Sequence, residues 1–235
     1  MSIRSLASAS LLPPRAAGVL WEALVEDSGV LVVIVDADGV VRFSNDMFAR
    51  IYADRDARAI IGLRIDQVLP PAMAQERLQV VRSVALSGKP VQLRSTWRGV
   101  RQRAFLRPLP ARVEGRRAVL VVVRPELAGE TENDGLRVIQ AKHVDEGPLA
   151  ALSPRERTVL SLIGEGMSTA QMAEKLGRSA KTIENQRYSL ARKLGARNRV
   201  ELARIALRAG LSTPAAPSAA ERSARRRHAT LSRKG

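Results

Sequence analysis

The sequence contains no cysteine, and this absence excludes several kinds of chemistry. A chain without thiols cannot form disulfides, use a thiolate nucleophile, or bind zinc or an iron-sulfur cluster through cysteine. Apolar runs are also short: none is longer than the six residues from Val30 to Val35, whereas a membrane-spanning helix needs about 20. No sustained hydrophobic segment follows the first charged residue, so a signal peptide is not expected. We therefore expect a cytoplasmic protein.

Patterns typical of catalysis are absent as well. The sequence has no glycine-rich loop of the kind that binds phosphate groups, no metal-ligand spacing, and no convincing pair of nucleophile and base. It also lacks the acidic pocket and phosphoacceptor strand of a response-regulator receiver. We therefore expect no enzymatic activity, no cofactor and no bound metal.

Positive charge is what the sequence has in excess. The 39 Lys and Arg residues outnumber the 23 Asp and Glu residues, which gives a net charge of +16. The excess grows toward the C-terminus: residues 149–211 contain 12 basic and 5 acidic residues, and residues 212–235 contain 6 and 1. Such a distribution predicts a polyanionic partner, either nucleic acid or an acidic membrane surface.

The length of 235 residues suits two modest domains, and the first is predicted at residues 18–125. A β-branched run at Val30 to Val35 predicts a buried strand, and the Asp36-Ala37-Asp38-Gly39 turn leads to a second strand. A longer helix is predicted at Met73 to Leu86, where Ser87-Gly88 ends it. Three further strands are predicted at Val91 to Trp97, Gln102 to Leu106 and Ala118 to Arg124.

This order of elements resembles a PAS sensor domain. The resemblance rests on the Asp36 to Gly39 turn, Asn45 at the start of the next helix, the Ile61-Gly62 step, the Ser87-Gly88 helix stop and the closing Val119 to Val123 strand. It implies a five-stranded antiparallel sheet with helices on one face, so the predicted fold class of the chain is α+β.

The PAS resemblance also implies a pocket between the sheet and the short helices, which would take a small-molecule ligand or a protein partner. For each candidate side chain the alternative is an ordinary place in the core. The candidates are Val33, Phe43, Met47, Phe48, Tyr52 and Phe105. Both histidines, His143 and His228, fall outside the PAS-like region, so a histidine-ligated haem is not expected there.

Composition sets the remaining boundaries. Residues 1–17 are an N-terminal arm, residues 126–148 are an acidic linker, and residues 212–235 are a basic tail without periodicity that is predicted to be disordered. An apolar island at Leu136 to Ile139 interrupts the linker, and it suits a helical connector and a stray apolar patch equally well. The tail either adds phosphate contacts or only keeps the chain soluble.

Residues 149–211 carry start and stop signals for four helices. Capping boxes begin the first two, at Ser153 to Glu156 and Ser168 to Gln171. The third helix starts after Ser179 and ends at Gly195, and the fourth runs from Asn198 to Gly210. The second and third helices, joined by a turn at Gly177-Arg178, make a helix-turn-helix.

This segment closely resembles the DNA-binding domain of the LuxR/FixJ type. The resemblance rests on Leu152 to Leu160, Gln171 to Gly177, Lys181 to Ile183, and Arg192 to Leu202. It implies that the third helix enters the major groove of double-stranded DNA. The residues implied in DNA contact are Lys181, Thr182, Glu184, Asn185, Arg187, Tyr188 and Arg192.

The chemistry of these residues agrees with that role, because Asn can pair with adenine, Glu can accept from cytosine, and cations meet phosphates. The alternative for Glu184 is a bond within its own helix to Lys181 or Tyr188. Many family members carry Lys in place of Glu184 and His in place of Gln186, so their operator preference does not transfer to this chain.

The fourth helix is a dimer contact in some members of the family. Its apolar residues Val200, Ala203 and Leu207 either serve that purpose or fill the core of the domain.

We therefore expect a homodimeric bacterial transcription regulator without membrane contact, whose PAS-like domain senses a ligand or partner, with RNA polymerase as a further candidate partner. Two alternatives remain. One is a sigma-factor-like promoter binder, whose domain shares the Leu-Ser-x-x-Glu-Arg opening. The other is a PAS interaction adaptor whose helix-turn-helix contacts protein.

Overall fold

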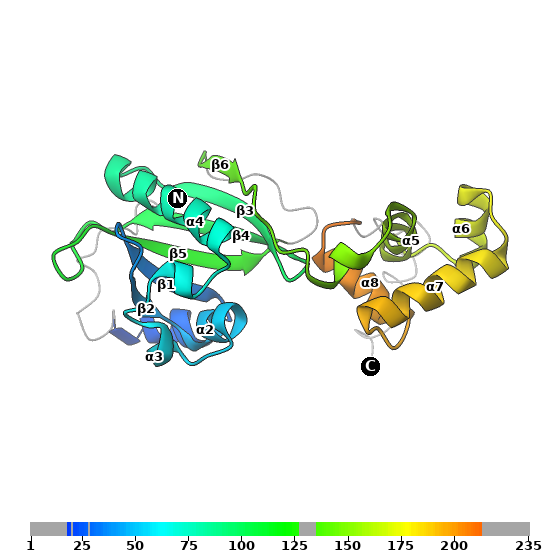
Figure 1. The fold of residues 1–235 in the computed structure, drawn as a ribbon, viewed down its shortest axis with the longest axis horizontal. Helices are drawn as coiled ribbons and strands as arrows, with labels where there is room; N and C mark the ends of the chain where they lie inside the picture. The colour runs from blue at the N-terminus through cyan, green and yellow to red at the C-terminus, as the bar shows by residue number, and fades with distance from the viewer. Residues whose placement is uncertain (1–17, 20, 28, 127–134, 213–235) are drawn as a thin grey trace, which may run out of the picture. The chain divides into compact units, whose positions relative to one another are not determined.

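The computed structural model describes residues 18–19, 21–27, 29–126 and 135–212 (Figure 1). The chain divides into two compact units: the first contains most residues up to Val144, and the second contains residues from Asp145 on, together with residues 96–101 and 125–132. The predicted N-terminal arm, the linker residues 127–134 and the tail from residue 213 lie outside the described residues. In the described ranges, no helix is long and apolar enough to cross a membrane.

A six-stranded sheet forms the centre of the first unit, in the order β2-β1-β5-β4-β3-β6. Strand β1 pairs antiparallel with both β2 and β5, and β6 pairs parallel with β3. The strands are β1 Leu31–Asp36, β2 Val41–Ser44, β3 Val91–Trp97, β4 Val100–Pro108, β5 Ala118–Pro125 and β6 Arg137–Gln140. The α+β class and the five predicted strands are confirmed.

The sixth strand corrects the prediction of five. It lies in the stretch that was expected to be a linker, where the apolar island was interpreted as a helical connector or a stray patch. The island is neither, because residues 137–140 pair with β3 and Ile139 packs against the core of the sheet. A four-residue strand gains its stability from this pairing rather than from local propensity.

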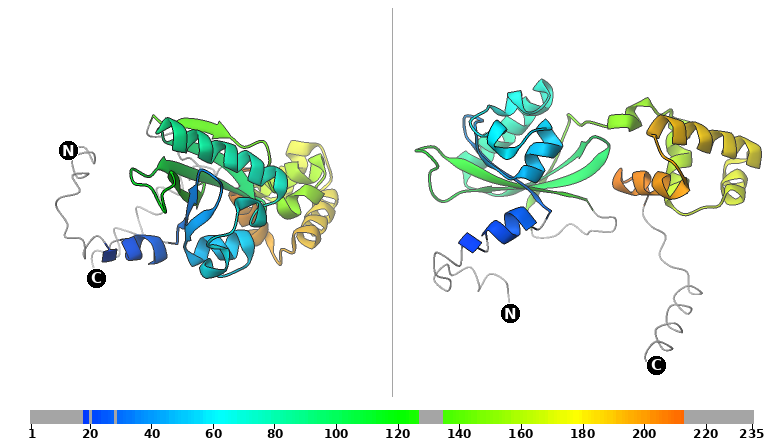
Figure 2. Two further views of the ribbon diagram at one scale, coloured as in Figure 1. Left: turned by 60° about the vertical axis from the view of Figure 1, so that its left-hand side comes forward. Right: turned by 90° about the horizontal axis from the view of Figure 1, so that it is seen from below.

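Helices cover one face of the sheet (Figure 2). They are α2 Asp46–Ala53, α3 Ala57–Ile60, α4 Pro71–Ser87 and the single turn η3 Ile65–Gln67. Alternation along β1 buries Leu31, Val33 and Val35 on this side, where Val81 and Val84 of α4 meet them in one core. The N-terminal helical segment, which ends in the turn η2 Ala23–Asp27, lies on the other side of the sheet.

Asn45 fixes the junction between β2 and α2, as a fully satisfied buried side chain. Its Oδ1 accepts from Phe48 N at 3.0 Å, which caps α2, and from Val32 N at 3.0 Å in β1. Its Nδ2 donates to the carbonyls of Val25 and Val30 at 2.7 and 2.8 Å. An aspartate would keep the cap but would lose both donated bonds, so the fold requires the amide here.

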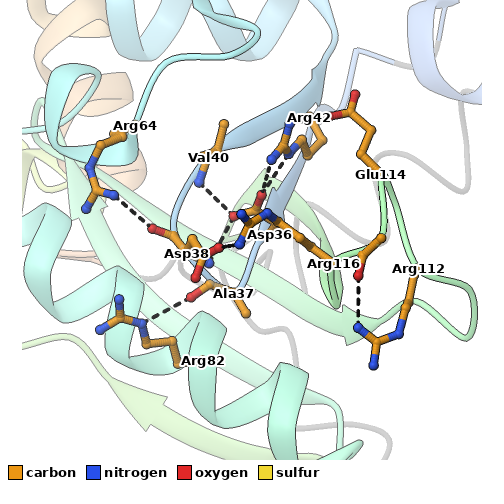
Figure 3. Close-up of polar contacts among 11 residues, drawn as sticks. Asp36, Ala37, Asp38, Val40, Arg42, Arg64, Arg82, Arg112, Glu114 and Arg116 are labelled. Carbon is orange, nitrogen blue, oxygen red and sulfur yellow. Dashed lines mark hydrogen bonds and ion pairs between the residues drawn. The ribbon is translucent and has the colours of Figure 1, made fainter.

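The predicted turn after β1 is built around the buried carboxylate of Asp36 (Figure 3). Its Oδ1 accepts from Asp38 N at 2.9 Å and Val40 N at 3.0 Å, and its Oδ2 accepts from Arg42 Nε at 2.7 Å. Gly39 has a φ of +90°, and a Cβ there would lie 3.0 Å from Leu78 Cδ1. Glycine is therefore favoured by both backbone angle and space.

Four helices form the second unit, after a short turn η4 Gly147–Ala151. They are α5 Pro154–Gly164, α6 Thr169–Leu176, α7 Ala180–Leu194 and α8 Arg199–Arg208. All four predicted starts are confirmed, because the side chain of each cap residue accepts from the amide three residues later: Ser153, Ser168, Ser179 and Asn198. A Cβ on Gly164 would lie 2.7 Å from Ala206 Cβ, so α5 and α8 pack too closely for a side chain at that position.

Glu156 ties α7 to α5. Its Oε2 accepts from Ser153 N at 2.9 Å, which closes the capping box, and from Lys193 Nζ at 2.8 Å. Its Oε1 accepts from Ser189 Oγ at 3.1 Å. The bond from Lys193, followed by those from Ser153, lowers the pKa of Glu156 to about 2. The folded domain therefore favours the ionised carboxylate.

We predict that Glu156→Gln destabilises the helical domain by on the order of 2 kcal/mol at pH 7. Because the folded pKa is depressed, the stabilisation is present above an unfolded pKa near 4.5 and is lost as the pH falls toward about 2. Hydrogen exchange of peptides from α5 and α7 measures the opening free energy of this domain across that pH range. The difference between the two proteins should narrow with falling pH. Glu174→Gln, at an exposed glutamate of α6, is the matched control and should show no such difference.

Candidate nucleic-acid interface

The helix α7 has one buried side that holds it to its domain. Ile183 and Leu190 are fully buried in the core of the second unit, and Leu194 packs against them. Ser179 caps the first turn, and Gly195, with a φ of +64°, ends the helix. These contacts all lie on one side of α7, so the residues on its opposite side are not needed to hold the helix in place.

That opposite side is exposed and mixed in chemistry. It presents side chains that recur three or four residues apart: Lys181, Glu184, Asn185, Tyr188 and Arg192. Tyr188 is 75% exposed, so this aromatic residue contributes little to the core. The face combines amide and carboxylate groups, which can pair with base edges, with cations that can meet phosphates.

Glu184 makes only a weak bond within its own helix. Its Oε2 lies 4.0 Å from Lys181 Nζ, and both side chains are largely exposed. An exposed pair of this kind contributes at most about 1 kcal/mol. The pairing considered as an alternative for Glu184 is therefore present, but it does not prevent the carboxylate from taking another partner.

Two of the predicted DNA-contacting residues are placed differently. Thr182 is half-buried in the first turn, with its Oγ1 2.8 Å from Ser179 Oγ. Arg187 is also half-buried, and its Nη1 donates to Thr169 Oγ1 at 3.1 Å, at the first residue of α6. Arg187 thus ties the two helices of the helix-turn-helix together and is less exposed than Asn185 and Tyr188.

An exposed cation that the sequence prediction omitted lies in the turn between these helices. Arg178 directly precedes the cap of α7 and lines a hollow of about 170 Å³ together with Arg155 and Gln186. The sequence could have indicated Arg178 as a candidate for DNA contact, because it lies in the turn of the helix-turn-helix directly before the third helix. Lys193, by contrast, is committed to Glu156.

The last helix leaves one apolar side chain uncovered. Leu202 and Ala206 are buried in the core, while Ala203 and Leu207 are half-buried. Val200 is 60% exposed. Of the three residues considered for a dimer contact, Val200 is therefore the least buried in the core of its own domain.

The structure brings together three of the six candidates for a PAS pocket. Val33, Phe48 and Tyr52 lie on the helix-covered side of the sheet, and the rings of Phe48 and Tyr52 stack with centroids 4.6 Å apart. The Tyr52 hydroxyl donates to Gln102 Oε1, a polar partner on β4 that the sequence prediction missed. Burial raises the pKa of Tyr52, so this hydroxyl keeps its proton.

The other three candidates lie elsewhere. Phe43 pairs in register with Ile34, and the centroid of its ring lies 5.7 Å from that of the Trp21 ring. The Phe105 ring lies under the Arg124 guanidinium, 5.4 Å from the ring centroid. Met47 is 37% exposed. In the part of the chain that the structure covers, no three acidic or histidine side chains gather as metal ligands.

Two family models match the chain, one in each unit. Residues 25–126 match the model described as PAS fold, and residues 150–206 match the model described as bacterial regulatory proteins, luxR family. The first range contains strands β1 to β5 and the helices between them but not β6, and the second contains the helix-turn-helix.

Curated relatives match over short stretches. The response regulator UvrY of Escherichia coli is 38% identical over 66 residues, which are 28% of this chain and 30% of that protein. The transcriptional regulatory protein RcsB of Escherichia coli is 47% identical over 51 residues, 22% of this chain and 24% of that protein. MctR of Rhizobium johnstonii is 40% identical over 73 residues, 31% and 34% of the two chains. The chain thus spans about a third or less of the length of these relatives.

Solved structures resemble the chain weakly. A ligand and DNA complex of VqmA from Vibrio cholerae has a TM-score of 0.39 at 19% identity and covers 90% of both chains. The PAS domain of BvgS from Bordetella pertussis has a TM-score of 0.39 at 14% identity and covers 48% of this chain and 88% of that chain. TM-scores this low do not carry function from one protein to another.

The family matches agree with the capped helices of the second unit and the sheet topology of the first. Residues 25–126 are a PAS domain, and residues 150–206 are a helix-turn-helix domain of the luxR family of bacterial regulatory proteins.

Proposed function

We propose that the protein is a sequence-specific DNA-binding transcription regulator that binds as a homodimer and is controlled through its PAS domain. The observation that carries the proposal is the exposed face of α7, where Asn185, Glu184 and Tyr188 stand between the cations Lys181 and Arg192. Two copies would read half-sites about one helical turn of DNA apart. Exposed Val200 on α8 supports a contact between copies.

Selection of bound sequences from random duplex DNA, followed by affinity measurement at several salt concentrations, tests this function. An enriched site with two related halves is the expected result. A failure to enrich any sequence would reject specific regulation and leave the interaction-adaptor alternative.

In this proposal, Asn185 and Glu184 choose the site and Lys181 positions the helix. We predict that Asn185→Ala costs about 1–3 kcal/mol of discrimination at one base pair and hardly changes binding to unrelated DNA. Glu184→Ala should relax preference at another base pair, with non-specific affinity equal or higher, because a negative charge is removed.

Lys181→Ala serves as the contrasting variant in the same assay. It should weaken binding to all sequences alike and reduce the salt slope by about 0.9, as for the loss of one phosphate contact. A variant of Asn185 with the same uniform loss would contradict its assignment as a base reader.

Control by the PAS domain would pass through β6, which lies in the first unit shortly before the second unit resumes at Asp145. Ala141 N donates to the Arg94 carbonyl at 2.9 Å and extends the pairing of β6 with β3. Beyond it, Glu76 of α4 accepts from Lys142 N at 2.7 Å and His143 N at 3.0 Å. We call this pair of bonds the Glu76 latch. It holds the last residues before the second unit begins.

The latch is close to the interior of the PAS domain. Burial acts to raise the pKa of Glu76, but the two amide bonds and Arg77 outweigh it and lower that pKa below its ordinary value. Arg77 pairs with Glu76 at 3.1 Å and is near enough to Tyr52 to lower the pKa of that hydroxyl, against the larger effect of burial. In this proposal, a ligand that moved Tyr52 would change the electrostatic environment of Arg77, which pairs with Glu76, and would shift the equilibrium between docked and free linker.

We predict that Glu76→Ala speeds hydrogen exchange of the amides in residues 137–143 by about tenfold or more, because each lost bond to a charged acceptor is worth about 1.5–3 kcal/mol. The same variant should change the DNA affinity of the full chain. Asp56→Asn is the control, since this exposed aspartate makes no cap bond to α3. Faster exchange with unchanged DNA affinity would separate the latch from regulation.

A further inference from the structure

One end of the PAS domain gathers arginines around the turn after β1 (Figure 3). Three of the guanidinium groups have acidic partners. Arg42 pairs with Asp36 at 2.7 Å, Arg64 with Asp66 at 3.4 Å, and Arg116 with Asp38. Glu114 is also taken, by Arg42. Each of these four acids thus has an arginine partner, although Asp36 and Glu114 share Arg42.

Three further arginines at this end are held by backbone carbonyls instead. Arg82 Nε donates to the Ala37 carbonyl at 3.1 Å, and Arg112 Nη1 donates to the Gly115 carbonyl at 2.9 Å. Arg117 Nη1 donates to the carbonyls of Ala85 and Leu86 at 3.3 and 3.4 Å, at the C-terminal end of α4. Within the described ranges none of the three makes an ion pair.

These bonds hold the arginines in place without using them up. A guanidinium group has five N–H donors in a rigid planar arrangement. The bonds to carbonyls occupy one nitrogen on each side chain, so Arg112 and Arg117 keep free donors. The three paired arginines face four acids, and Arg82, Arg112 and Arg117 therefore leave this end with two net positive charges. A guanidinium group with free donors is well suited to a phosphate or a carboxylate.

Two adjoining hollows share Arg112 and Arg117 in their walls. The larger, of about 590 Å³, contains no acidic residue in its lining and has an apolar wall that includes Leu86, Pro108 and Leu109. The smaller, of about 450 Å³, also contains Asp38, Glu114 and Arg116, which are two acids and one base, so that with Arg112 and Arg117 its lining keeps one net positive charge. Both volumes fall within the range of about 300–1,000 Å³ that is usual for small-molecule sites.

We propose that this end of the PAS domain binds a small molecule in which a phosphate or carboxylate group is joined to an apolar portion. Arg112 and Arg117 hold the oxyanion on the shared wall, and the larger hollow takes the apolar portion against Leu86 and Leu109. The hollow lies at the end of the sheet and of α4, outside the stacked Phe48 and Tyr52 of the interior. The phosphates of duplex DNA could bind the two arginines, but the sugars next to them offer no apolar group for the wall of the larger hollow.

Phenyl phosphate joins the two required groups and is a suitable probe. Its titration into the ¹⁵N-labelled full chain should shift the amides of Leu109, Ala111 and Gly115 in a saturable way. Inorganic phosphate and phenol, titrated separately, should bind these residues at least about tenfold more weakly, since each makes only one half of the contacts. Equal binding of phenyl phosphate and inorganic phosphate would overturn the proposal and leave a simple charge effect. Equal binding of phenol would overturn it in favour of an apolar patch.

Substitution of the arginines tests the same site. Arg112→Gln should weaken phenyl phosphate about tenfold, while Arg58→Gln, which removes an equal charge from exposed α3, should leave affinity unchanged. Equal loss in both variants overturns the proposal. If Arg112→Gln disturbs the spectrum of the full chain without phenyl phosphate, Arg117→Lys is used instead. Lysine can still donate to the Ala85 carbonyl, but it lacks the planar guanidinium group that binds an oxyanion through two parallel bonds. Unchanged affinity in that variant overturns the two-arginine site.

Discussion

The carboxylate of Glu156 is the interaction on which the DNA-binding unit depends. Only Ile183 and Leu190 of α7 are fully buried, which is little apolar surface to hold a helix whose other side must stay free. Glu156 adds polar bonds from Ser189 and Lys193 of the same helix and at the same time caps α5. One side chain thus caps the start of α5 and helps to fix the position of α7. The direction in which the exposed face of α7 points therefore depends on Glu156.

Where the sequence predicted the fold well, the determining contacts were local. Each helix of the second unit begins at a cap residue whose partner lies three residues away, as Ser153 and Glu156 illustrate. The turn at Asp36 to Gly39 is local in the same sense, because the Asp36 carboxylate binds amides two and four residues later. Patterns of this kind are complete within a short window of sequence.

The parts that the sequence did not predict depend on distant partners. The bond from Arg187 to Thr169 was not predicted because the acceptor lies on another helix. Strand β6 was missed because four residues between charged and glycine-rich stretches carry no strand signal until β3 provides an edge. Phe43 and Phe105 were grouped with Phe48 by residue type alone, although strand alternation places them away from the core beneath the helices.

The pairing of β6 with β3 also bears on solubility. β3 would be the outer strand of the sheet on its side if β6 were not there. An outer strand presents unpaired N–H and C=O groups that can join a strand of another molecule. If β6 were released from β3, the edge of β3 would stay exposed until β6 paired with it again. Under the proposed function, a signal that opened the Glu76 latch and released β6 would therefore also expose this edge to strands of other molecules.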